Sequence, residues 1–154
     1  GTPIVTHAML RAISKLEPTW DGQREFAAAI DLETGRMGLM CDDKDLWPGR
    51  WSTHHPVTHA PVAGRLIFAW PEVKAMAVAA HLVFADRMLV GWDIAVTPDG
   101  PIILEGNSYP DVHFLQRVHN QPIGLSRLGP LLQDALGALR IRDRHMVEEP
   151  VRPA

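Results

Sequence analysis

The chain has 154 residues, and 15 lysines and arginines against 18 aspartates and glutamates give a formal net charge of −3 with neutral histidines. This length fits one domain, and 46% hydrophobic with 21% charged residues is a composition that can bury a core, which excludes disorder for the bulk of the chain. The acidic balance and the lack of a lysine and arginine run argue against a nucleic-acid partner, because such binding depends on clustered cations.

The cysteine content and the hydropathy pattern bear on the compartment. The single cysteine, Cys41, has no partner for an internal disulfide, which favours a reducing compartment. The first ten residues lack the order of a signal peptide, and no apolar run reaches the roughly 20 residues that a membrane span needs. We therefore expect a cytoplasmic protein without a membrane span.

The first part of the chain is typical of short strands. Apolar runs bounded by turn residues predict three of them, at Ile4–Thr6, Phe26–Ile30 and Met37–Met40. Residues 31–36 predict the hairpin corner that joins the last two strands. Residues 41–69 contain three prolines and three histidines, and they predict a long surface loop that ends in a short strand near Leu66–Phe68.

Two helices are predicted further along. The first begins at Pro71, because a proline in the first helical turn has no amide to leave unpaired, and it ends near Arg87. The second begins at Pro130 and ends near Leu139, and its apolar residues also recur at helical spacing. We expect residues 1–140 to form one α+β domain, a mainly antiparallel sheet covered by two helices, and residues 141–154 to form a flexible tail.

Residues 90–107 predict a β-hairpin. Thr97–Gly100 has proline at the second turn position and glycine at the fourth, which suits a type I turn followed by a glycine bulge. Counting outward from that three-residue loop places Asp93 opposite Glu105 and Gly91 opposite Asn107 on one face. The other face would be apolar and would contain Trp92, Ile94, Val96, Ile102 and Leu104. A two-residue turn would instead shift the register by one and separate the two carboxylates.

The paired carboxylates carry the chemical interpretation. Like charges directly opposite each other destabilise a sheet, so another group should offset the repulsion between Asp93 and Glu105. Together with Asn107 they offer the hard oxygen ligands that Mg²⁺ or Mn²⁺ prefers, with other positions left to water or phosphate. Two alternatives stay open, a proton held by one carboxyl with a raised pKa and an ordinary solvated acidic surface.

These residues resemble a known family. Gly91–Pro101 followed by Ile103–Asn107 looks like the metal-binding hairpin of ATP-grasp enzymes, most closely the sugar-transfer associated ATP-grasp proteins. The segments His55–Thr58 and Asp31–Gly35 are also similar to that subgroup, and the resemblance covers roughly residues 30–132. It implies the fold of an ATP-grasp C-terminal portion.

The resemblance implies a function as well. In such a protein, Asp93, Glu105 and Asn107 would hold one or two Mg²⁺ (or Mn²⁺) ions that bridge the β- and γ-phosphates of ATP, and Arg11 would lie near the transferred phosphate. The implied reaction is Mg-ATP-dependent ligation, in which a carboxylate is activated as an acyl phosphate and then attacked by an amine, thiol or hydroxyl. The implied partners are ATP and a carboxylate or sugar-linked substrate, and the subgroup suggests surface-polysaccharide biosynthesis.

The sequence also departs from the family pattern. Lys15, Lys44 and Lys74 do not stand in the context of the family's nucleotide-clamping region, and the Asn and Gly-Gly that usually follow the early arginine are not visible in residues 20–25. We therefore expect the chain either to supply the metal-binding half of a longer enzyme, with an N-terminal nucleotide-binding half outside it, or to be a protein that has lost that half. Two rival functions are a non-catalytic binding module that retains the fold and a metal-dependent hydrolase of phosphate esters.

Three further groups of side chains are candidates: the loop histidines His54, His55 and His59, the pair His113 and His119, and the tryptophans Trp47, Trp51 and Trp70. The loop histidines predict either a transition-metal site or a polar loop near an acceptor substrate. The histidine pair predicts either substrate contacts or a loop that packs onto the core. The tryptophans predict either stacking on a sugar or base or simple burial of apolar area.

Overall fold

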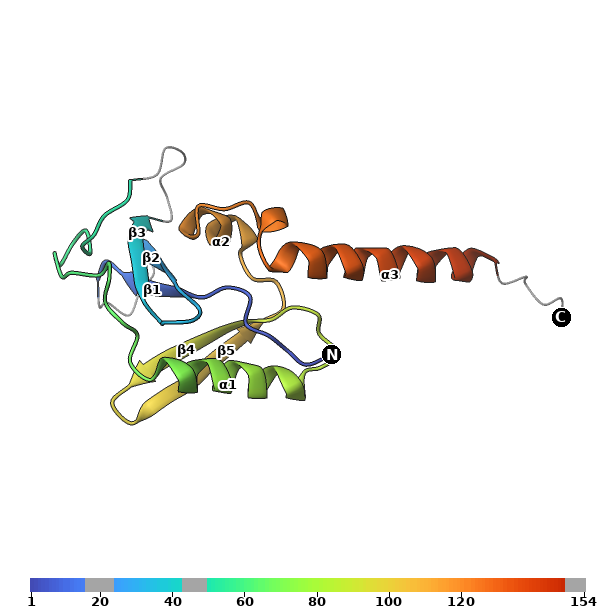
Figure 1. Cartoon of the computed structure of the whole chain (residues 1–154), viewed down its shortest axis with the longest axis horizontal. Coiled ribbons are helices and arrows are strands. Elements are labelled where there is room, and N and C mark those ends of the chain that lie inside the picture. The colour runs from blue at the N-terminus through green and yellow to red at the C-terminus, as the bar shows by residue number, and fades with distance from the viewer. Residues whose placement is uncertain (16–23, 43–49, 149–154) are drawn as a thin grey trace.

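The computed structural model describes residues 1–15, 24–42 and 50–148, with side chains up to residue 138. The described residues form two antiparallel sheets, three α-helices and one short 3₁₀ turn (Figure 1). The elements are β1 Met9–Ile13, β2 Glu25–Ile30, β3 Met37–Asp42, α1 Trp70–Val83, β4 Gly91–Thr97, β5 Gly100–Asn107, α2 Val112–Val118, η1 Ile123–Leu125 and α3 Leu128–Glu148. The expected α+β class is confirmed, and the antiparallel strands divide into a three-stranded sheet and a separate hairpin.

The core lies on both faces of β2, the central strand of the β1-β2-β3 sheet. One face joins Phe26 and Ala28 to Met40 and Val62, and the other joins Ala27 to Cys41 and Val118. Burial on both faces explains why β2 reads as a continuous apolar run instead of an alternating one.

The first strand lies later in the chain than expected. Residues 4–6 are outside any strand, and the strand is Met9–Ile13, whose residues pair with Glu25–Ala29 of β2. Leu10 and Ala12 alternate along β1 and pack against the Phe26 cluster, so burial and not the β-branched composition of residues 4–6 decides the pairing. The short strand expected near residues 66–68 is also wrong, because only one isolated bridge, Arg36 to Leu66, forms there.

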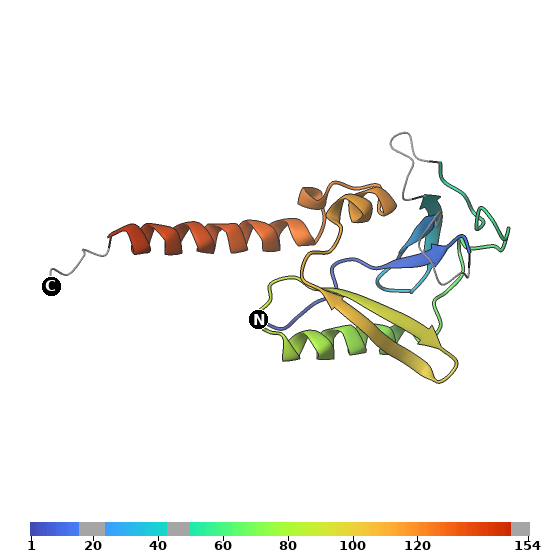
Figure 2. The ribbon, with the colours of Figure 1, turned by 180° about the vertical axis from the view of Figure 1, so that it is seen from behind.

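Helix α1 begins one residue before Pro71 and ends at Val83, earlier than the predicted Arg87. Its first residue, Trp70, is buried and donates from Nε1 to the Leu32 backbone oxygen at 3.1 Å. Gly35 makes this contact possible, because it has a φ of +73° and a Cβ there would lie 2.6 Å from the indole Cγ of Trp70. Figure 2 shows α1 running along one side of the β4–β5 hairpin.

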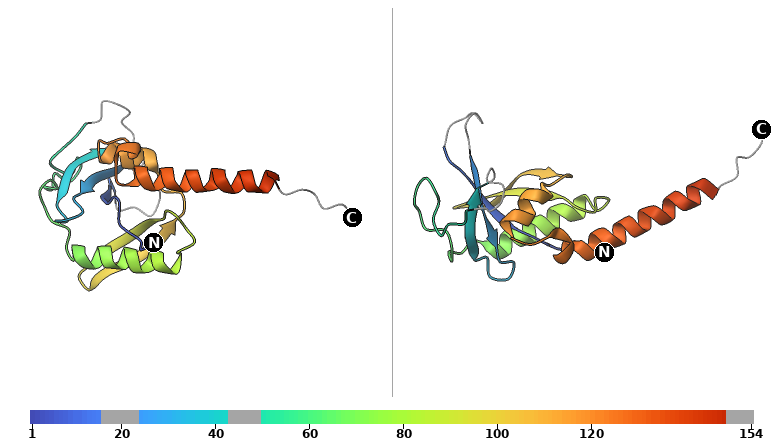
Figure 3. Two further views of the ribbon diagram at one scale, coloured as in Figure 1. Left: turned by 45° about the vertical axis from the view of Figure 1, so that its right-hand side comes forward. Right: turned by 90° about the horizontal axis from the view of Figure 1, so that it is seen from above.

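Two helices follow the hairpin. The sequence did not predict α2, which begins after Asp111, whose carboxylate accepts from the amides of His113 and Phe114 at 3.0 Å each. Helix α3 continues to Glu148, past the predicted end near Leu139, and Figure 3 shows it extending away from the rest of the molecule. The end of the predicted tail, residues 149–154, is outside the described residues. None of the helices described here is long and apolar enough to cross a membrane.

Candidate functional site

The β4–β5 hairpin places Asp93 opposite Glu105, as predicted, but with a different turn and register from those expected. Thr97 pairs with Gly100, so the turn contains only Pro98 and Asp99, and the three-residue loop is wrong. The register shifts between Asp93 and Ile94, where β5 accommodates one extra residue, Leu104. This bulge cancels the shift that the shorter turn introduces, so Asp93 still pairs with Glu105.

The bulge changes the composition of the two hairpin faces. Ile102 pairs with Ala95, which places it on the face of Asp93 and Glu105 and not on the apolar face that the sequence predicted. Ile102 is 53% exposed and Leu104 is 68% exposed, so neither belongs to a buried surface. The predicted uninterrupted apolar face is therefore wrong, because its register was counted from a three-residue loop.

A close packing contact lies at Gly106, between Glu105 and Asn107 of β5. Trp92 pairs with Gly106, and a Cβ on that glycine would lie 2.5 Å from the indole ring. Only glycine therefore lets the ring lie against β5 at this point. The Phe84 ring packs on Trp92 with the ring centroids 5.8 Å apart. This contact holds the apolar side of the strand while Glu105 and Asn107 flank Gly106 on the other side.

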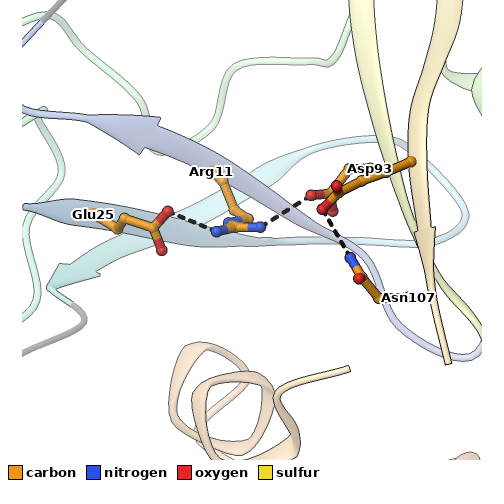
Figure 4. Close-up of polar contacts among 5 residues, drawn as sticks. Arg11, Glu25, Asp93 and Asn107 are labelled. Carbon is orange, nitrogen blue, oxygen red and sulfur yellow. Dashed lines mark hydrogen bonds and ion pairs between the residues drawn. The ribbon is translucent and has the colours of Figure 1, made fainter. Parts of the chain in front are cut away.

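Arg11 reaches the carboxylates from the other sheet, as Figure 4 shows. Its Nη1 lies 3.2 Å from Asp93 Oδ2, and its Nη2 lies 2.6 Å from Glu25 Oε1. Arg11 pairs with Ala27 and Glu25 pairs with Ile13, so Arg11 and Glu25 are diagonal neighbours on one face of β1 and β2. One guanidinium thus joins the sheet to the hairpin across 82 residues of sequence.

The sequence did not predict the role of Glu25. Its carboxylate becomes part of the group only through the pairing of β1 with β2, and the predicted position of the first strand was wrong. An alternation of Leu10 and Ala12 around Arg11 is the signal that could have placed Arg11 on a strand. Arg11 bonds Asp93 and so offsets part of the repulsion between the hairpin carboxylates, for which the sequence offered a metal or a shared proton.

The remaining contacts concern the electrostatics of the hairpin end. Asn107 donates from Nδ2 to Glu105 Oε1 at 2.9 Å, which orients both side chains. The pKa of Asp93 lies above its ordinary value, chiefly because burial raises it, and the Arg11 guanidinium opposes this shift only in part. The nearby Glu105 and Glu25 carboxylates raise the pKa of Asp93 further. The carboxylates therefore lie in a region that favours an added positive charge.

The donor set is compatible with a divalent cation of the Mg²⁺ type. Asp93 and Glu105 supply carboxylate oxygens and Asn107 supplies an amide oxygen, and such hard ligands suit Mg²⁺ or Mn²⁺ better than softer metals. Within the described ranges, no three or more His, Cys, Asp or Glu side chains gather in a way that could hold a metal ion. Two protein carboxylates would leave positions for water or phosphate oxygens.

The loop histidines have separate structural contacts. His55 is buried, its Nδ1 accepts from the amides of Val57 at 3.3 Å and Thr58 at 3.1 Å, and its ring packs edge-on against Phe26. His54 Nδ1 lies 2.9 Å from Thr53 Oγ1. His55 therefore organises a turn, and the transition-metal alternative has no support from these contacts.

The other candidates are mainly structural. His119 ends α2 and packs edge-on against His7 with ring centroids 5.0 Å apart, whereas His113 is exposed in the first turn of α2. Trp70 is buried and Trp51 packs against the Cys41 cluster. Both therefore bury apolar area, which is the second of the two alternatives that the sequence left open for the tryptophans. Trp47 lies outside the described residues.

Comparison with known proteins identifies one family. The sequence model of one family, described as sugar-transfer associated ATP-grasp, matches residues 5–128. The matched region contains Arg11 and the whole β4–β5 hairpin, and it extends through α2 to the first residue of α3. No curated protein and no solved structure matches the chain.

Proposed function

The chain belongs to the sugar-transfer associated ATP-grasp family, and on that premise we propose that it supplies the metal- and phosphate-binding half of an ATP-dependent ligase. The observation that carries the proposal is the open end of the hairpin, where Asp93 and Glu105 pair directly and Asn107 orients Glu105. A guanidinium, Arg11, lies at the same place. Oxygen ligands for a cation and a donor for phosphate are the two requirements of a site for metal-bound nucleotide phosphates.

Each residue has a distinct part in this proposal. Asp93, Glu105 and Asn107 would hold Mg²⁺ or Mn²⁺, which when bound neutralises charge on the β- and γ-phosphates of ATP. Arg11 would donate to the oxygens of the transferred phosphate, since its planar fork of N–H groups matches phosphate geometry. Trp92, packed on Gly106, would hold the strand that carries Glu105 and Asn107 in position from the opposite face of the hairpin.

The reaction we propose is the family's carboxylate ligation. A substrate carboxylate oxygen would attack the γ-phosphorus of ATP and release ADP, and an amine, thiol or hydroxyl would then displace phosphate from the acyl phosphate. The substrate would be a carboxylate or sugar-linked compound in surface-polysaccharide or related biosynthesis. Membership of the family supports these assignments.

We also propose that the adenine-clamping half comes from outside the described residues. Lys74 is committed to the fold, because its Nζ donates to the Leu32 backbone oxygen at 2.8 Å and lies over the Trp70 ring. It is therefore not placed as a nucleotide-clamping lysine. If only the phosphates contact this chain, its affinity for a triphosphate should depend little on the adenosine part.

The test uses the Mn²⁺ complex of inorganic tripolyphosphate, compared with the Mn²⁺ complex of a non-hydrolysable ATP analogue. Binding to the whole chain is followed by the enhancement of water-proton relaxation by Mn²⁺. We expect both complexes to bind with similar affinity and Glu105→Gln to weaken binding by at least about tenfold. Asp99→Asn is the matched control, because Asp99 lies in the turn of the same hairpin, away from the ligands.

Three outcomes would contradict the proposal. Equal binding by the wild type and Glu105→Gln would remove the hairpin from the site. An absence of binding by the wild type would favour the non-catalytic module. Release of orthophosphate from tripolyphosphate by the chain alone would favour the hydrolase.

A further inference from the structure

Arg11 occupies a position that a metal cation would also favour. Its guanidinium contacts Asp93, one of the three proposed metal ligands, from a different sheet. A divalent cation at the hairpin end and a guanidinium on the same carboxylate repel each other, and Arg11 already bonds Oδ2 of Asp93. The Arg11–Asp93 contact and metal binding therefore compete.

The two contacts of Arg11 are unequal. The N–O distance is 2.6 Å to Glu25 and 3.2 Å to Asp93, and charge-assisted bonds are strongest at the shorter distances. The Glu25 side chain is also less exposed, 20% against 34% for Asp93, so water screens its pair with Arg11 less. Loss of the Asp93 contact would leave Arg11 bonded to Glu25.

We propose that Arg11 is a built-in counter-cation that a divalent metal displaces from Asp93, and that Glu25 is the positioning residue that keeps the displaced guanidinium beside the site. This inference rests on the proposed metal site and adds Glu25 to it as a positioning residue.

The exchange has a consequence for phosphate binding. Before the metal binds, Arg11 reduces the repulsion between the hairpin carboxylates. The two opposed charges therefore destabilise the metal-free hairpin less. After the exchange, the N–H groups released from Asp93 are available to a phosphate oxygen, while Glu25 holds the other side of the fork. Metal binding would thereby prepare the phosphate donor in the same step.

The test is a titration of the whole chain with Mn²⁺ alone, at low ionic strength, with free Mn²⁺ followed by electron paramagnetic resonance. Arg11→Gln should raise Mn²⁺ affinity by about tenfold, because it removes a competing charge next to the ligands. Arg11→Lys should raise Mn²⁺ affinity by less. Lysine keeps the competing positive charge, but it lacks the fork of N–H groups that contacts Asp93 and Glu25 together. Arg36→Gln removes the same charge from a side chain that donates to the Gly64 backbone oxygen, and it should leave the affinity unchanged.

Glu25 is tested in both backgrounds. Glu25→Gln should lower Mn²⁺ affinity by about tenfold when Arg11 is present, because the guanidinium is then free to bind Asp93 alone, and by about twofold in the Arg11→Gln background, where only a distant charge is lost. Glu33→Gln, which removes an exposed carboxylate from the β2–β3 corner, is the charge control.

The outcomes separate the exchange from simple electrostatics and from failure of the site. Equal effects of Glu25→Gln in the two backgrounds would overturn the role of Glu25. Unchanged or weaker binding by Arg11→Gln would overturn the exchange. Mn²⁺ affinity left unchanged by Arg11→Lys would also overturn the exchange. If circular dichroism shows that Arg11→Gln does not fold, the test of the exchange depends on Arg11→Lys alone. If wild-type binding is absent or insensitive to Glu105→Gln, the proposed function fails and this inference fails with it.

Discussion

The three-stranded sheet and the β4–β5 hairpin are both antiparallel, but they differ in how they bury their side chains. In the sheet, Phe26, Ala27 and Ala28 are at most 1% exposed, with core side chains on both faces. In the hairpin, which is described in full, no residue is fully buried and Leu104 is 68% exposed. Stability therefore resides mainly in the sheet, while the hairpin end carries two opposed carboxylates, one of which, Asp93, is bonded by Arg11 of the sheet.

The largest effect should come from the sheet core. Phe26→Ala removes a side chain that is 1% exposed and should lower the free energy of unfolding by about 3–5 kcal/mol. Ile102→Ala, the comparison in the hairpin, should change it by only about 0.5 kcal/mol. Urea denaturation followed by circular dichroism measures both. Similar losses in the two variants would contradict the assignment of stability to the sheet.

A smaller loss is expected where the hairpin is packed. Gly106→Ala places a Cβ 2.5 Å from the Trp92 ring and should cost about 1–3 kcal/mol through displacement of that ring. The same change should weaken Mn²⁺ binding, because Glu105 and Asn107 flank the altered residue. Gly124→Ala is the control, since its Cβ would meet nothing within 4 Å. Urea denaturation and the Mn²⁺ titration together would contradict the account if Gly106→Ala were neutral in both.

A third expected effect depends on pH. Burial lowers the pKa of His7, with a further contribution from His119, and burial also lowers the pKa of His119 although a backbone bond to Ala8 opposes it. The unfolded chain therefore binds protons first as the pH falls below about 6.5, and the free energy of unfolding should decrease from there until both folded-state pKa values are passed.

Denaturation of the wild type at pH 7.5 and at pH 5.5 measures this pH effect. His119→Gln should flatten the difference between the two pH values, whereas substitution of the exposed His113 by Gln should leave it intact. A chain that gains stability toward pH 5.5 would contradict the assignment to the histidine pair.

The smallest effect on stability should come from the carboxylates. Glu105→Gln removes one of two opposed charges and keeps an oxygen that accepts from Asn107, so the free energy of unfolding should stay unchanged or rise by about 0.5 kcal/mol. Asp99→Asn in the turn is the matched control. Urea denaturation that shows a large loss for Glu105→Gln would mean that the carboxylates are structural.

Local patterns predicted much of this fold. The strands β2 and β3, the start of α1 and the existence of the hairpin follow from apolar runs and turn residues close together in sequence. The Asp93–Glu105 pair was also predicted, although two local errors, in the loop and in the bulge, cancelled. Turn length and a compensating bulge depend on packing of the whole hairpin, which a turn signature does not contain.

Features that depend on distant contacts were not predicted. The position of β1 follows from its pairing with β2, and the contacts of Arg11 with Glu25 and Asp93 appear only once both the sheet and the hairpin are in place. Helix α2 is a different case, because its start has a local signal in Asp111, a side chain that accepts from two following amides.

The most direct test of the central claim is to locate bound Mn²⁺ by its paramagnetic broadening of amide signals in nuclear magnetic resonance spectra. The account predicts that substoichiometric Mn²⁺ broadens the amides of residues 91–93, 105–107 and Arg11 first, and that excess Mg²⁺ restores them. Glu105→Gln should abolish this pattern and Asp99→Asn should keep it. Broadening centred on the histidine loop, residues 54–59, or spread evenly over the surface would contradict a metal and phosphate site at the end of the hairpin.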